Sequence, residues 1–240
     1  HRINDSIVAE DDASLVKSIV TGADATTGEF HNVRVINGGS LMTSAENREF
    51  SIARGKVPGQ SPLFKFGFNA TVGAAWELVW EGSTVYNYRS SEEIFKIKSA
   101  SVEDDTDKGA GVPGTGAHTV TVYCVNEAWV EVEQTVTLNG TAAVDLTSPC
   151  MIVYRMNVDS VGTSGYGVGT ISLYQNDGTT LQLTITPGNN QSLISHVPVP
   201  DGRTLYLVYM NVSDVSSKIT QIGVFVKEFG KPWQLKQSFS

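Results

Sequence analysis

The residues of this chain that come closest to metal chemistry form one acidic cluster, Glu103, Asp104, Asp105 and Asp107. Calcium binds several carboxylate oxygens at once, so such a cluster is a candidate cation site. The spacing is not that of an EF-hand, because Lys108 stands where that motif would carry another ligand or a turn glycine. The glycine-rich run GAGVPGTG follows directly. The sequence therefore favours a solvated loop over a calcium site.

Two pairs of carboxylates could be proposed for glycoside hydrolysis, Glu92 with Glu93 and Glu131 with Glu133. Retaining glycosidases hold two carboxyl groups ~5 Å apart across a cleft, usually on different strands. Glu131 and Glu133 instead share one face of a predicted strand with threonines, which is typical of an ordinary wetted face. We therefore predict no enzymatic activity, and a carbohydrate-active β-sandwich enzyme is the remote alternative.

The remaining motifs of catalysis and cofactor binding are missing from the sequence. The histidines show no zinc-binding spacing; they are His1, His31, His118 and His196. The glycine-rich segment 160–170 leads into a predicted strand, whereas a phosphate-binding loop opens a helix. No G-x-S-x-G elbow and no P-loop is present. We expect no cofactor and no bound metal.

Four aromatic residues lie close together in the sequence, Trp76, Trp80, Tyr86 and Tyr88. Together they could form a platform on which a sugar stacks. Aromatic side chains on strands are more often core or subunit-contact residues. The set is therefore a candidate glycan or subunit contact.

The two cysteines, Cys124 and Cys150, are too few for a disulfide scaffold or a zinc site. Buried free thiols are the expected state. A single bridge between neighbouring strands is the less favoured alternative.

The elements that must position these residues are predicted to be strands. In segment 130–138 valine and leucine alternate with glutamate and threonine, which requires a sheet with one buried and one wetted face. Asp177-Gly178 between two such segments is a strong hairpin signal. The predicted strands of the main region are 64–68, 75–80, 93–101, 118–125, 129–138, 151–158, 169–175, 180–186, 192–199, 204–212, 218–229 and 232–239.

This pattern predicts an all-β protein with a β-sandwich or jelly-roll-like main domain over residues 63–240. Residues 1–55 are predicted to form a small β-hairpin segment, with Glu49–Gly55 as its last strand, and residues 56–62 a linker rich in proline and glycine. Hairpins of that size rarely stand alone. We expect the N-terminal segment to attach to the main domain or to a neighbouring subunit.

Composition narrows the partners. The formal net charge is −8, from 17 basic and 25 acidic side chains, and the basic ones are scattered. Nucleic acid binding requires clustered lysine and arginine, so nucleic acid and anionic membranes are disfavoured as partners. No run approaches the ~20 apolar residues of a membrane span. Charged residues make up only 18% of the chain, which is typical of sheets whose outer faces contact other protein.

Several segments of the main region carry a family resemblance. They are FNATVGAAWELVW at 68–80, SASVEDDTDKGAGVPGTGAHTVTVYCV at 99–125, VEVEQTVTLNGTAAV at 130–144, YRMNVDSVGTSGYGVGTISL at 154–173 and VFVKEFGKPWQLKQSF at 224–239. In these strand-and-turn motifs the chain resembles a family of structural proteins of tailed bacteriophages, especially marine ones, over roughly residues 68–240. The resemblance implies a virion component that is assembled in the bacterial cytoplasm.

The expectation is thus a non-enzymatic virion structural protein. Its partners would be further copies of itself and other virion proteins such as the major capsid protein. Two placements remain open. The favoured one is a capsid decoration or cement protein, and the alternative is a tail adaptor or tail-fibre module, with host glycan as a further partner.

Overall fold

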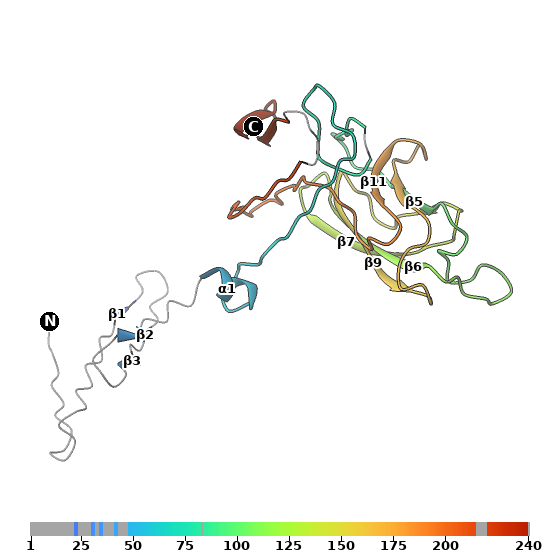
Figure 1. Ribbon diagram of the computed structural model, residues 1–240, viewed down its shortest axis with the longest axis horizontal. Helices are drawn as coiled ribbons and strands as arrows, with labels where there is room; N and C mark the ends of the chain where they lie inside the picture. The colour runs from blue at the N-terminus through green and yellow to red at the C-terminus, as the bar shows by residue number, and fades with distance from the viewer. Residues whose placement is uncertain are drawn as a thin grey trace, which may run out of the picture. The chain divides into compact units, whose positions relative to one another are not determined.

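The computed structural model describes residues 48–82, 84–214 and 220–239, together with the backbone of four short strands that precede residue 48. The chain divides into two units, His1–Phe64 and Lys65–Ser240. Figure 1 traces both along the sequence.

In the first unit two pairs of short strands are antiparallel. β1 (Gly22–Ala23) pairs with β2 (Phe30–His31), and β3 (Arg34–Val35) pairs with β4 (Leu41–Met42). The rest of the predicted N-terminal hairpins lies outside the described residues.

The expected strand at Glu49–Gly55 is wrong, because Arg48–Ala53 is the helix α1. The amide of Arg54 donates to the Phe50 carbonyl at 3.0 Å, as in a helical turn. Glu49 in the first turn complements the helix dipole, and Gly55 ends the helix at a positive φ of 69°. Phe50 and Ile52 alternate with other residues as apolar residues do in a strand. This pattern favours a strand over the helix that Glu49 and Gly55 indicate.

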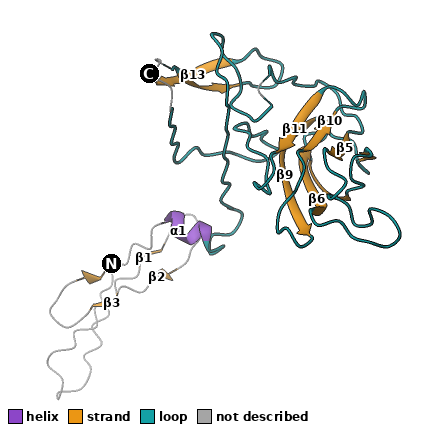
Figure 2. Cartoon of the chain, turned by 45° about the vertical axis from the view of Figure 1, so that its right-hand side comes forward, coloured by secondary structure: helices purple, strands orange, loops and turns teal. Residues whose placement is uncertain are grey.

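The second unit is built on two antiparallel sheets (Figure 2), which confirms the all-β prediction. The first sheet has the order β7-β6-β9, and the second has the order β11-β10-β5-β8. The first contains β6 (Ala117–Val125), β7 (Glu131–Thr137) and β9 (Ile152–Val161). The second contains β5 (Lys96–Ser99), β8 (Val144–Asp145), β10 (Ile171–Tyr174) and β11 (Leu181–Ile185).

Buried side chains of both sheets form one hydrophobic core, which makes the pair a β-sandwich. The first sheet contributes Val120, Val122, Cys124, Val136, Val153 and Met156, and the second contributes Ile97, Ile171, Leu173, Leu183 and Ile185. In β7 the predicted alternation is observed, since Glu131, Glu133 and Thr135 are exposed while Val136 is buried. Burial of this apolar surface is the main stabilising contribution to the sandwich.

The predicted hairpin at Asp177-Gly178 is confirmed, because β10 and β11 pair through it. Gly178 has a positive φ of 71°, which a side chain would oppose. The carboxylate of Asp177 accepts the amides of Thr179 and Thr180 at 2.8 Å. The Thr180 hydroxyl donates to the same carboxylate at 2.5 Å. This bond first, and then the two amide bonds, lower the pKa of Asp177 to about 2.

Four predicted strands are absent from the described residues, those at 64–68, 75–80, 192–199 and 204–212. In two of them a single bridge remains, between Trp80 and Ile194. The last two predicted strands are confirmed as β12 (Ile222–Val226) and β13 (Gln234–Phe239), which form a separate antiparallel pair. Every residue of β13 is exposed.

Candidate functional site

The four aromatic residues singled out from the sequence do not form one surface. Trp80 is 1% exposed, and its ring meets that of Tyr86 edge-on with centroids 5.2 Å apart. Tyr86 is buried in turn against Tyr88, at 4.7 Å. Trp80 and Tyr86 are therefore core residues, and their ring faces are closed to a ligand.

Trp76 lies apart from this core cluster. It is 51% exposed and packs edge-on against Phe225 of β12, with centroids 5.2 Å apart. Tyr88 is partly buried and contacts Trp233, which is itself exposed and lies under the ammonium group of Lys227. Of the predicted contact residues, Trp76 and Tyr88 are thus the two that retain accessible ring surface.

His196 joins the aromatic cluster, and sequence reasoning missed it. Its ring centroid lies 4.8 Å from that of Tyr86, and its Nε2 is 2.8 Å from the Val153 carbonyl. Its Nδ1 is buried and has no hydrogen-bond partner among the described residues. Burial lowers the pKa of His196 to about 4, so the ring is neutral at pH 7. No spacing motif marks this residue in the sequence.

Lys65 is a partly buried base beside the aromatic cluster. It donates to the Tyr154 carbonyl of β9, and burial lowers its pKa to about 7. The hydroxyl of Tyr154 donates to Glu131, and burial together with this bond raises the tyrosine pKa. The Lys65 bond anchors the segment around that residue to β9, and the Tyr154 bond joins β9 to Glu131 of β7.

The acidic cluster is solvated only in part: Asp107 is exposed as expected, but Asp104 and Asp105 are buried, which corrects the sequence-based expectation for these two residues. Asp104 is fully buried, and its carboxylate accepts four hydrogen bonds. The donors are the amides of Ala117, Val168 and Gly169, at 2.7, 2.9 and 2.8 Å, and the hydroxyl of Ser99, at 2.5 Å. Asp104 therefore joins three separate parts of the chain.

Glycines make room for this buried carboxylate. A Cβ atom on Gly116 would lie 2.0 Å from Asp104 Oδ1, and one on Gly114 would lie 2.1 Å from the Glu103 carbonyl oxygen. A Cβ atom on Gly169 would lie 2.5 Å from the hydroxyl oxygen of Ser99. Gly114, Gly116 and Gly169 thus serve close packing, whereas a Cβ atom on Gly109, Gly111 or Gly165 would meet nothing within 4 Å.

The other carboxylates of the cluster turn toward different partners. Glu103 pairs with Lys108 at 2.8 Å, and this contact lowers the glutamate pKa. Asp107 accepts the amides of Gly109 and Gly111, at 2.9 and 3.0 Å. Within the described ranges no group of three or more histidine, cysteine, aspartate or glutamate side chains converges as metal ligands would.

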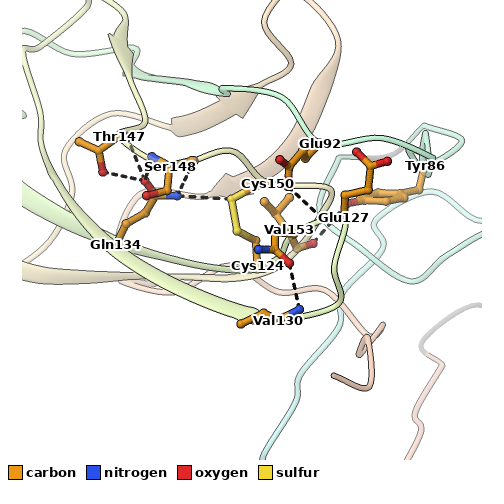
Figure 3. Close-up of a disulfide and its surroundings, with 11 residues drawn as sticks. Tyr86, Glu92, Cys124, Glu127, Val130, Gln134, Thr147, Ser148, Cys150 and Val153 are labelled. Carbon is orange, nitrogen blue, oxygen red and sulfur yellow. Dashed lines mark hydrogen bonds between the residues drawn. A yellow bond between two sulfur atoms is a disulfide. The ribbon is translucent and has the colours of Figure 1, made fainter. Parts of the chain in front are cut away.

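The expectation of free thiols is wrong, because Cys124 and Cys150 form a disulfide (Figure 3). Cys124 is in β6 and Cys150 lies just before β9, and the antiparallel pairing of these strands brings the two together. Both are fully buried. Counting two cysteines could not predict the bridge, since it depends on the register of the sheet.

Gln134 of β7 fixes the loop that leads into Cys150 (Figure 3). Its Oε1 accepts the amides of Thr147 and Ser148, both at 3.0 Å. Its Nε2 donates to the Ser148 carbonyl at 3.0 Å and to the Cys150 sulfur at 3.4 Å. A buried amide with all these partners is a stabilising element of the core.

Three of the four carboxylates considered for glycoside hydrolysis have a local partner. Glu93 forms a 3.1 Å ion pair with Arg89, and Glu92 accepts the amide of Glu127 at 3.0 Å. Glu131 accepts the Tyr154 hydroxyl. These carboxylates thus occupy separate structural contacts.

Several parts of the second unit expose large apolar side chains, including β13 and two segments without strand structure. In the run Leu205–Val212, which we call the apolar run, Tyr206 and Tyr209 are each 78% exposed. The other exposed members are Leu205, Leu207, Val208, Met210 and Val212. Around Lys65 the exposed residues are Phe66, Phe68 and Val72, which we call the phenylalanine stripe. Apolar patches of this extent mark interaction surfaces.

Comparisons of the chain with protein-family models, with curated proteins and with solved structures find no match. Among the residues that the structure describes, no helix has the length and apolar character of a membrane span.

Proposed function

We propose that this chain is a non-enzymatic structural protein of a tailed-bacteriophage virion, and that it decorates or cements the capsid through β-rich contacts with copies of itself and with the major capsid protein. The observation that carries the proposal is the apolar run, a surface that a subunit of an assembly covers with a neighbour. The strand-and-turn resemblance over residues 68–240 supports the virion context.

The physical basis of such a role is cumulative contact. Many modest apolar contacts add up when identical subunits repeat around a symmetric particle. The sandwich supplies a rigid body, because a disulfide and the Asp104 hydrogen bonds cross-link its loops. Rigid subunits lose little conformational entropy on assembly, which favours binding.

Immunogold labelling of intact virions with an antibody to this chain tests the proposal. Gold spread over the head supports capsid decoration. Virions without gold, in preparations where a known capsid protein is labelled, contradict a virion role.

A tail adaptor or fibre module is the second candidate, and a specific observation favours it. Trp76 and Trp233 both retain exposed ring surface, and exposed aromatic rings suit stacking on host glycan. Gold confined to the tail would establish this placement. A glycan-binding screen with Trp76→Ala as the matched variant would then test the receptor role.

A further inference from the structure

We propose that the apolar run of one copy docks on the phenylalanine stripe of a second copy of this chain. The inference rests on the proposed assembly role and names the partner and the two segments that meet.

The first observation is the composition of the apolar run. If Leu205–Val212 adopts strand geometry, Leu205, Leu207 and Tyr209 lie on one face, and Tyr206, Val208 and Met210 on the other. Both faces are then largely apolar, with Asn211 as the one polar residue of the run. Strands of this kind are buried on both sides, whereas a strand at a protein surface alternates apolar with polar residues.

The second observation is that the run lacks its strand partner. The described residues pair no strand with 204–212, and its large side chains are exposed. An unpaired strand-forming segment is a template for addition to another chain.

The third observation is the inverted orientation of the phenylalanine stripe. Lys65 turns inward and donates to the Tyr154 carbonyl, and Gly67 lies so close to the body that a Cβ atom on it would be 2.9 Å from the Ser195 Cβ. Phe66 and Phe68 turn outward and are exposed, the former by 60%. A segment that places its polar and small residues inside and its rings outside presents those rings to a partner.

The absence of charge in both segments favours a second copy of this chain as the partner. Residues 204–212 and 66–72 contain no aspartate, glutamate, lysine, arginine or histidine, in a chain in which 18% of residues are charged. Two neutral apolar segments of the same molecule match each other, and neither attracts a polyanion.

The area is sufficient for a stable contact. Each large apolar side chain removes on the order of 100 Å² from water when it is covered. One docked segment therefore buries on the order of 1,000 Å² over both partners, and a reciprocal pair about twice that, which is the size of specific interfaces.

The test uses the full chain with p-benzoylphenylalanine in place of Tyr206, prepared as an equal mixture of ¹⁴N and ¹⁵N protein. After irradiation, mass spectrometry locates the cross-links. We expect mixed-isotope peptides that join residue 206 to residues 65–72. Cross-links to that segment within single-isotope peptides alone, or a monomer in sedimentation velocity at micromolar concentration, would overturn the inference.

Two exposed positions supply the variants, so that folding is preserved. Val208→Asp and Phe66→Asp should each weaken self-association by about 100-fold or more, because each places a charge in the contact. Val85→Asp is the matched control, since Val85 is 85% exposed and lies outside both segments. It should change self-association by less than about twofold. Equal weakening by all three variants would contradict the docking.

The outcomes separate this inference from the proposed function. If virions are labelled with gold but the chain is a monomer in sedimentation velocity, the docking is contradicted and the virion role is retained. If mixed-isotope cross-links form but virions carry no gold, the docking is retained and the virion role is contradicted.

Discussion

The carboxylate of Asp104 and the α-carbon of Gly116 are so close that a Cβ atom on Gly116 would lie 2.0 Å from Asp104 Oδ1. The neighbouring amide of Ala117 donates to the same oxygen at 2.7 Å. The buried Asp104 side chain and the absence of a side chain at Gly116 thus determine how the loop 101–116 packs against strand β6 and the loop 162–170. The first two predictions test this relationship.

Gly116→Ala should lower the free energy of unfolding by about 2–4 kcal/mol, because the new methyl group displaces a buried hydrogen-bonded carboxylate. Gly73→Ala is the matched control, since its Cβ would approach only the Glu77 side chain, at 3.7 Å. Urea denaturation of both variants measures the difference. Equal stability of the two variants would contradict the arrangement.

Asp104→Asn should lower the free energy of unfolding by about 3 kcal/mol, because the new amide group turns a donor toward backbone amides that need an acceptor. Asp107→Asn makes the same change three positions along the chain. There Oδ1 accepts the amides of Gly109 and Gly111 at an exposed site, and asparagine keeps such an oxygen. The control should lose less than about 1 kcal/mol. Thermal unfolding of the two variants decides between a buried anchor and a solvated loop.

Removing the disulfide by Cys124→Ala with Cys150→Ala should lower the free energy of unfolding by roughly 3–4 kcal/mol, because the bridge closes a loop of 26 residues in sequence separation. A reducing agent should destabilise the native chain and leave the double variant unchanged. Thiol titration of the unfolded, unreduced protein should find no reactive thiol. Two reactive thiols in that titration would contradict the bridge.

Stability should depend on pH through His196. Its pKa is lowered from 6.5 to about 4 in the folded protein, so the unfolded chain takes up the proton first as the pH falls. The contribution is therefore fully present above pH 6.5 and is lost as the pH drops toward about 4, by up to about 3 kcal/mol. His196→Gln should flatten this part of the profile. Denaturant midpoints between pH 4 and pH 7 measure the slope.

The two tryptophans of the candidate contact should respond differently to truncation. Trp80→Ala should cost about 3–5 kcal/mol, because it empties a buried site next to Tyr86. Trp76→Ala should cost less than about 1 kcal/mol, since half of that side chain is exposed. If the aromatic set contacts a glycan or a subunit, only Trp76→Ala weakens that binding in a folded protein. Unchanged binding by the Trp76→Ala variant would place the contact elsewhere.

Local patterns predicted part of this structure correctly. The alternation of residues 130–138 located β7 and its buried face, and Asp177-Gly178 located the turn between β10 and β11. Such features depend on residues within a few positions of one another, and side-chain period and turn chemistry are visible at that range. The short helix α1 was missed because Phe50 and Ile52 also fit a strand.

Contacts between distant segments could not be read in this way. The burial of Asp104 depends on amides at 117, 168 and 169, and the disulfide depends on the register of β6 against β9. The aromatic set was identified as a group, yet only packing separated buried Trp80 from exposed Trp76. His196 contacts Tyr86 although more than a hundred residues separate the two in the sequence.

The sequence by itself therefore determined the β class of this protein, several of its strands and turns, and its net negative charge. Local periodicity and composition are sufficient for these properties. The tertiary structure alone decided which carboxylate is buried, which rings face solvent, how the cysteines pair, and where apolar segments are left uncovered. Each of these depends on side chains that meet only after distant strands have taken their register.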